Sequence, residues 1–137
     1  MVDSELLRRR IDALLHYVSL LREFAKDDQR SFVDEPARHH LAERYLHLAA
    51  EAALDIANHL IADRGLEAPE TYRSSFAILS RHGIISDDLS SRLQAWAGLR
   101  NILVHAYLEI DHSLTHHAIC SDLGDLEELA EVAARLL

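Results

Sequence analysis

Hydrophobic residues recur every three or four positions along most of the chain, as in helices that bury one face. From Ser4 to Lys26 the recurring apolar positions are Leu7, Ile11, Leu14, Leu15, Val18 and Leu21. A polar loop through residues 27–30 follows, and Pro36 opens a longer helix that is expected to end at Gly65. Its apolar positions are Leu41, Tyr45, Leu48, Ala52, Ile56 and Leu60, with several alanines beside them. Such small residues allow a neighbouring helix to approach closely.

The second half of the chain predicts three more helices. Pro69 and Thr71 start a short one that stops before Gly83. Ser86 is a favourable N-cap for the next helix, which begins with two aspartates. That helix carries Leu89, Leu93, Trp96 and Leu99 and continues into residues 100–107.

A break is expected at residues 110–112, where Asp111 can cap a last helix that reaches Leu136. The chain shows no alternating strand pattern, no repeat and no low-complexity linker. The predicted fold is therefore all-α, an up-and-down bundle of about five helices with short connections. Residues 1–137 are long enough to bury one core, and we expect them to form a single domain.

The net charge of the chain limits which kinds of molecule it can bind. The chain holds 23 acidic and 14 basic residues, a net charge of −9 with histidine neutral. This balance disfavours non-specific binding to nucleic acid, so an RNA substrate would need a local basic patch. It also suits a basic protein partner. No apolar run is long enough to span a bilayer and the first residues lack a signal-peptide pattern, so we expect a cytoplasmic protein without membrane partners.

The segment Arg100–Tyr107 carries the candidate chemistry. It places a guanidinium, a carboxamide, an imidazole and a phenol in a helix that is otherwise typical of a core. An imidazole can transfer protons near neutral pH, and a fixed guanidinium can stabilise developing phosphate charge. Arg100 and His105 are together the minimum needed to cut a phosphodiester without a metal.

Helical geometry limits how these groups can meet. Asn101 and His105 are four residues apart and share a face, whereas Arg100 and His105 are about 140° apart around the axis. Either the helix ends near His105 and the imidazole turns toward Arg100, or two chains of a symmetric dimer build the site together. We favour the dimer, and the helix end can contribute as well.

The run Arg100–Asp111 resembles the Arg-x4-His-x-Tyr motif of HEPN-domain toxins, in particular the HepT family. The similarity extends along most of the chain. Glu43–Leu46 and Glu51–Ile61 resemble the long second helix of that family. Thr71–Phe76 and His82–Ile85 resemble its next segment.

The resemblance implies a helical homodimer that cleaves RNA as a toxin, without a metal or another cofactor. It implies catalytic roles for Arg100 and His105, with Asn101 as the polar residue that assists them. It also implies a partner, an MntA-type minimal nucleotidyltransferase that acts as antitoxin by attaching AMP to the motif tyrosine, here Tyr107. The bulk and negative charge of that AMP would block RNA from the neighbouring cation.

Two alternatives accompany this interpretation. HEPN-like bundles also serve as non-catalytic docking modules for nucleotidyltransferases, and an acidic surface suits that role. Ten histidines raise the question of a metal, since His112 and His116 have the spacing of a helical ligand pair and His40 and His47 share a face. No cysteine cluster or His-Glu-x-x-His motif supports a metal site, and we expect none.

Three polar residues lie among apolar positions of the long helix, namely Asp55, Asn58 and His59. Their expected role is hydrogen bonding between helices.

Overall fold

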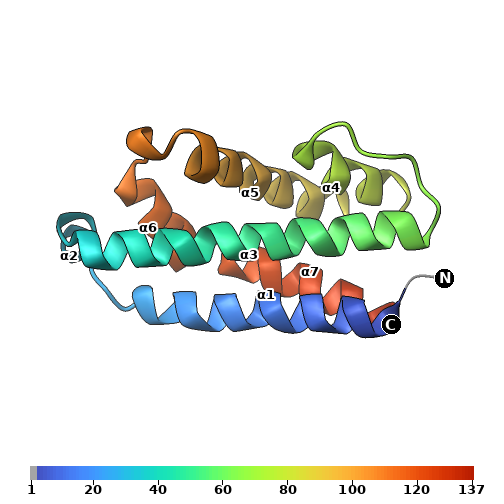
Figure 1. Cartoon of the computed structure of the whole chain (residues 1–137), viewed down its shortest axis with the longest axis horizontal. Helices are drawn as coiled ribbons and strands as arrows, with labels where there is room; N and C mark the ends of the chain where they lie inside the picture. Colours follow the sequence, from blue (N-terminus) through green and yellow to red (C-terminus); the bar gives the residue numbers. More distant parts are fainter. Residues whose placement is uncertain (1–2) are drawn as a thin grey trace.

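The computed structural model describes residues 3–137 and shows an up-and-down helical bundle (Figure 1). In this range the chain forms seven α-helices, one 3-10 turn and no strand. The helices are α1 (Ser4–Phe24), α2 (Gln29–Asp34), α3 (Pro36–Asp63), α4 (Tyr72–Arg81), α5 (Asp87–His105), α6 (His112–Ser121) and α7 (Leu123–Arg135). The long helices α1, α3, α5 and α7 run antiparallel in turn, and the shorter ones lie toward the ends of the bundle.

The all-helical prediction is confirmed, but the expected number of about five helices is wrong for two reasons. Helix α2 lies where a loop was predicted. The Asp28 carboxylate caps it by accepting a hydrogen bond from the Ser31 amide (2.8 Å), and Phe32 is fully buried beneath it.

The predicted last helix is two helices, because the chain turns at Asp122 between α6 and α7. The buried residues Ile119, Leu123 and Leu126 keep helical spacing across this turn. The periodicity therefore gave no sign of the break.

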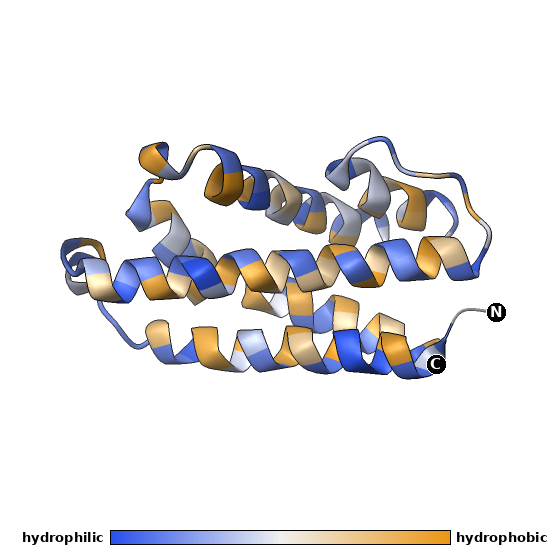
Figure 2. Cartoon of the chain, viewed as in Figure 1, coloured by the Kyte–Doolittle hydropathy of each residue, from blue (hydrophilic) through white to orange (hydrophobic). Residues whose placement is uncertain are grey.

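Helix α3 is the central element and contacts all six other α-helices. It is consequently buried on more than one side, with alanines at many of the contact positions, while apolar and polar positions alternate in short blocks along it (Figure 2). Ala52, Ile56 and Leu60 are buried as predicted, but Leu41 is 47% exposed and Leu46 is fully buried instead. None of the described helices is both long and apolar enough to cross a membrane.

The chain leaves helical geometry immediately after His105. Ser86 caps the start of α5 as predicted, with its hydroxyl accepting from the Leu89 amide (3.0 Å). Helix α5 ends at His105, and the segment Tyr107–Glu109 forms the 3-10 turn η1. The predicted cap at Asp111 is confirmed, since its carboxylate accepts from the Ser113 amide (2.9 Å). The hydroxyl and amide hydrogen bonds from Ser113 hold the pKa of the Asp111 carboxyl below its ordinary value.

The two leucines of α3 give a matched test of this packing. Leu46→Ala should lower the free energy of unfolding by about 2–5 kcal/mol, because it leaves a cavity in the core. Leu41→Ala should change it by only about 0.5 kcal/mol, because its side chain is largely in solvent. Urea denaturation followed by circular dichroism measures both. Equal losses for the two variants would contradict the burial described for α3.

Candidate functional site

Asn101 and His105 line one groove, as their spacing predicts. The groove has a volume of about 660 Å³ and lies between α3, α5, the start of α4 and the segment that precedes α4. Its other lining residues are Asn58, Pro69, Glu70, Thr71, Tyr72 and Ser75. His105 is exposed at the end of α5, so its imidazole is accessible to a molecule bound in the groove.

Arg100 lies outside the residues that line the groove, and two neighbours fix its side chain. Its Nε donates to Oε1 of Glu51 (2.5 Å), and its guanidinium carbon lies 4.3 Å from the ring centre of Tyr72. The side chain is only 11% exposed. Its Nη1 donates to Oδ1 of Asn101 (3.3 Å), so Asn101 and Tyr72 connect the guanidinium to the groove that His105 shares.

Helix α5 ends at His105, as one of the two predicted arrangements required. Arg100 and His105 nevertheless do not line the same groove of one chain. The guanidinium is a cation in a fixed position, held by one carboxylate and one aromatic face. The imidazole of His105 lies on an accessible surface. Together they provide the elements of phosphoryl transfer, but not in contact with each other.

Glu51 and Tyr72 were not predicted as site residues. Both lie in segments that carry the family resemblance, but an acidic residue on an amphipathic helix normally indicates a solvated face. Glu51 Oε1 also lies 3.5 Å from Nε2 of His47. Nη1 of Arg44 lies 3.1 Å from Nδ1 of the same imidazole, so His47 lies between an arginine and the carboxylate that holds Arg100.

Asn58 combines the structural role that we predicted with a place in the groove. Its Oδ1 accepts a hydrogen bond from the buried Ser75 hydroxyl (2.9 Å), which joins α3 to α4. Asp55 and His59 do not line the groove. Burial and the nearby Arg10 lower the pKa of His59, and burial raises the pKa of Asp55.

Tyr107 lies on the 3-10 turn and points away from the core. It is 65% exposed, and the adjacent Leu108 is 87% exposed. The phenol is therefore not a buried core aromatic, and it is accessible from solvent without any unfolding of the bundle.

Comparison with known proteins decides the family. Residues 14–133 match the sequence profile of the ribonuclease HepT-like proteins. The chain belongs to this family. It is 37% identical over 87 residues to the mRNA nuclease HepT of Shewanella oneidensis, an alignment that spans 64% of this chain and 65% of that protein, just under two thirds. It is 25% identical over 118 residues to the tRNA nuclease HepT of Aphanizomenon flos-aquae, covering 86% of this chain and 80% of that one.

The fold agrees with the family assignment. The tri-AMPylated Shewanella oneidensis HEPN toxin, solved in complex with its MNT antitoxin, superimposes with a TM-score of 0.87 at 27% identity. The superposition covers 98% of this chain and 99% of that toxin. The two folds therefore correspond over nearly their whole length.

His112 and His116, which have the spacing of a metal-ligand pair, form hydrogen bonds with different partners in this HepT-like chain. His112 Nδ1 lies 2.6 Å from Oε2 of Glu43, and the same oxygen accepts from the Thr115 hydroxyl (2.7 Å). His116 Nε2 donates to the Asp27 carbonyl instead (2.8 Å). Between residues 3 and 137, histidine, cysteine and acidic side chains form no group of three or more that could hold a metal ion. These rings therefore join α6 to α3 and to the segment that follows α1.

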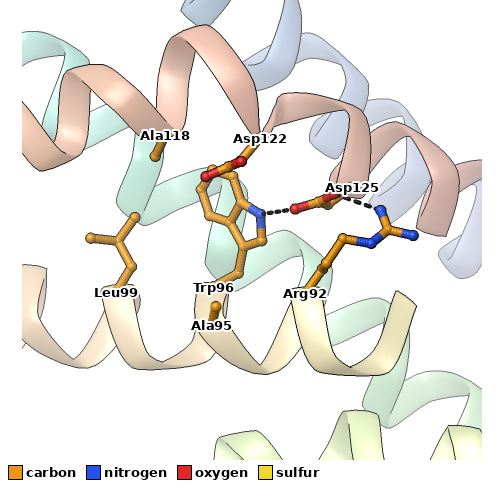
Figure 3. Close-up of a pocket in the computed structure, with 7 residues that line it drawn as sticks. All are labelled: Arg92, Ala95, Trp96, Leu99, Ala118, Asp122 and Asp125. Carbon is orange, nitrogen blue, oxygen red and sulfur yellow. Dashed lines mark hydrogen bonds and ion pairs between the residues drawn. The ribbon is translucent and has the colours of Figure 1, made fainter. Parts of the chain in front are cut away.

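A second cavity, of about 300 Å³, lies between α5, α6 and α7 (Figure 3). On one side of it Asp125 accepts hydrogen bonds from Nη1 of Arg92 (2.6 Å) and from Nε1 of Trp96 (3.2 Å). Burial, with the nearby Asp125, raises the pKa of the Asp122 carboxyl, which lies beside it at the cavity (Figure 3). We interpret this network as a structural connection between α5 and α7, because the residues that line the cavity include no histidine, serine or cysteine.

Because Asp125 accepts hydrogen bonds from two residues of α5, we expect it to stabilise the fold. Asp125→Ala leaves the buried indole N–H of Trp96 without an acceptor and should lower the free energy of unfolding by about 1–3 kcal/mol. Urea denaturation followed by the fluorescence of Trp96, the single tryptophan, measures this. Glu128→Ala removes a more exposed carboxylate that also binds Arg92 and should cost less than about 1 kcal/mol. Unfolding curves of Asp125→Ala that coincide with those of the parent would contradict a structural role.

Proposed function

We propose that this chain is the toxin of a toxin–antitoxin pair and a metal-independent endoribonuclease that acts in the cytoplasm. One observation carries the proposal: His105 is exposed beside Asn101 on a groove, and Arg100 is fixed behind it by Glu51 and Tyr72. Relatives named as mRNA and tRNA nucleases support ribonuclease activity as the use of this arrangement. The substrate class is therefore RNA.

The 2′-hydroxyl supplies the nucleophile. His105 removes the proton of the RNA 2′-hydroxyl, and the resulting 2′-oxygen attacks the adjacent phosphorus. The bond from phosphorus to the 5′-oxygen breaks, and a second imidazole donates a proton to the leaving oxygen. Arg100 stabilises the charge that develops on the pentacovalent phosphorane, and Asn101 orients the phosphate or the imidazole. The products are a 2′,3′-cyclic phosphate and a 5′-hydroxyl.

A homodimer supplies what one chain lacks. Within one chain Arg100 and His105 do not line the same groove, so a second copy related by a two-fold axis would bring two such pairs together. The partner copy of His105 would then be the second imidazole. Ile102, on α5 between the two catalytic positions, is 45% exposed and provides apolar surface for this association.

The second partner is an MntA-type nucleotidyltransferase antitoxin, and Tyr107 is the residue that receives AMP. The support is the exposed phenol on the 3-10 turn, together with the structural relative that is an AMPylated toxin bound to its MNT antitoxin. AMP at this position would add bulk and negative charge near the end of α5, where RNA must bind.

Cleavage in chelator tests the catalytic proposal. The purified protein should cleave RNA in EDTA and leave 2′,3′-cyclic phosphate ends. His105→Ala should lower the rate by about 10²–10⁴-fold, the usual contribution of a general acid or base. His117→Ala, which removes another exposed histidine on α6, is the matched control and should retain the parental rate.

Activity that disappears in EDTA but survives in His105→Ala would refute the catalytic proposal. Expression in cells separates it from the docking-module alternative. A nuclease toxin should arrest growth in the absence of antitoxin, and His105→Ala should relieve the arrest. A docking module would bind the nucleotidyltransferase without either effect.

The assignment of Tyr107 has its own test. Tyr107→Phe should cleave RNA at the parental rate but should not accept AMP from the partner nucleotidyltransferase, because the acceptor oxygen is missing. Intact-protein mass spectrometry after incubation with ATP and the partner measures the transfer. Tyr45→Phe, on the half-buried tyrosine of α3, should still be modified. AMP on the Tyr107→Phe protein with loss of its activity would assign the acceptor to another residue.

A further inference from the structure

Arg73, the second residue of α4, is an exposed cation that no carboxylate neutralises. It makes no hydrogen bond or ion pair with any residue between 3 and 137. By contrast, many arginines that join segments of this fold are paired with acidic side chains: Arg22, Arg38, Arg81, Arg92 and Arg100. In a chain with a net charge of −9, an unpaired guanidinium next to the proposed active site needs an explanation.

Gly98 of α5 determines where this guanidinium lies. A Cβ atom added at Gly98 would lie 3.2 Å from Cζ of Arg73 and closer still to its Nη2. The guanidinium therefore rests against the backbone of α5, in the space that a side chain at position 98 would occupy. Glycine weakens a helix interior relative to alanine, and here its absent side chain makes room for Arg73.

This position is on the catalytic face of α5. Gly98, Asn101 and His105 follow one another at three and four residues and share a face of the helix. The Arg73 guanidinium thus lies on the same side of α5 as Asn101 and His105, about 10 Å before His105 along the axis.

The first turn of α4 positions both of its leading side chains. It is closed by a capping box, in which the Ser74 amide donates to the Thr71 hydroxyl (3.1 Å) and the Thr71 amide donates to the Ser74 hydroxyl (2.8 Å). Tyr72 from this turn packs on Arg100, and Arg73 packs on Gly98. One capped turn therefore supports the catalytic arginine and presents a second, unpaired one.

We propose that Arg73 is a phosphate-binding residue for the RNA substrate, and that it contacts the backbone a few nucleotides from the bond that is cut. This inference rests on the proposed ribonuclease function. A guanidinium binds phosphate oxygens through two parallel hydrogen bonds, and Arg73 has all of its donors available. Because the net charge provides no general attraction for RNA, individual arginines of this kind must hold the strand.

RNA binding by an uncleaving protein tests the assignment. In a His105→Ala background, the affinity for a fluorescein-labelled single-stranded RNA of mixed sequence is measured by anisotropy at several salt concentrations. Arg73→Gln should weaken binding on the order of tenfold, the effect of losing a charged hydrogen-bond donor. It should also reduce the slope of log affinity against log salt by about 0.7, the value for one phosphate contact on a single strand.

Arg135→Gln is the matched control, because it removes the same charge from an exposed arginine in the last turn of α7. Neither the affinity nor the salt slope should change in this variant. Equal losses in the two variants would mean that total charge, not the position of Arg73, holds the RNA, and would overturn the assignment.

Gly98→Ala provides a second route to the same contact. The new methyl group would displace the guanidinium of Arg73 while improving the helix, so the melting temperature should stay the same or rise as RNA affinity falls. Combined with Arg73→Gln, it should cause no further loss, since the two changes remove one contact. A full additional loss in the double variant would overturn the role of Gly98 in placing Arg73.

Two outcomes distinguish the role of Arg73 from the ribonuclease function. If the parent protein neither cleaves nor binds RNA, the proposed function is refuted, and the role of Arg73 with it. If the parent cleaves and binds RNA while Arg73→Gln keeps the full affinity and salt slope, only the role of Arg73 is refuted.

Discussion

Three polar side chains of α3 position the rest of the functional region. Glu43, Glu51 and Asn58 lie about two turns apart along this central helix, and each binds a different segment. Glu43 contacts the first residues of α6, Glu51 holds Arg100 of α5, and Asn58 accepts from the first half of α4. Helix α3 contacts every other α-helix, so polar side chains at these contacts can bond to several neighbouring segments at once. The hydrogen bonds of these three side chains thus connect α3 to the elements around the groove.

The clearest case is Glu43, which is only 5% exposed. Its Oε2 lies against His112 and Thr115, and the His112 ring stacks on His39 at 3.6 Å between ring centres. Its Oε1 has no hydrogen-bond partner among the described residues. These contacts fix the start of α6, just as Glu51 fixes the last turns of α5. The short segment between the two helices is held at both ends, and this allows Tyr107 to remain exposed without the support of a core.

The helices were predictable where local chemistry defines their ends, and less so elsewhere. Pro36, Ser86 and Asp111 each mark a boundary through their own backbone or hydroxyl and carboxylate geometry. The turn at Asp122 was hidden, because apolar spacing continues across it. Leu41 was misplaced because a helix that is buried on several sides has no single apolar stripe.

For the site, spacing alone placed Asn101 and His105 on one face and kept Arg100 apart from His105. The contact of Arg100 with Glu51 joins residues 49 positions apart, and no local pattern encodes it. Gly98 is a similar case. In the sequence it is only a weak position in a helix, and its meaning depends on which side chain arrives from α4.

The acidic surface also has a kinetic consequence. For an RNA strand, a chain with a net charge of −9 is repulsive at distances beyond a few side chains, so encounters are slowed. Added salt screens this long-range repulsion within about one Debye length, roughly 8 Å at physiological ionic strength, and it weakens each local phosphate contact as well. For the proposed RNA substrate, screening would therefore speed arrival while it shortens the time that the strand stays bound. Capture of RNA, the proposed substrate, would then be governed by how often the two molecules collide in the correct orientation, rather than by electrostatic guidance from afar.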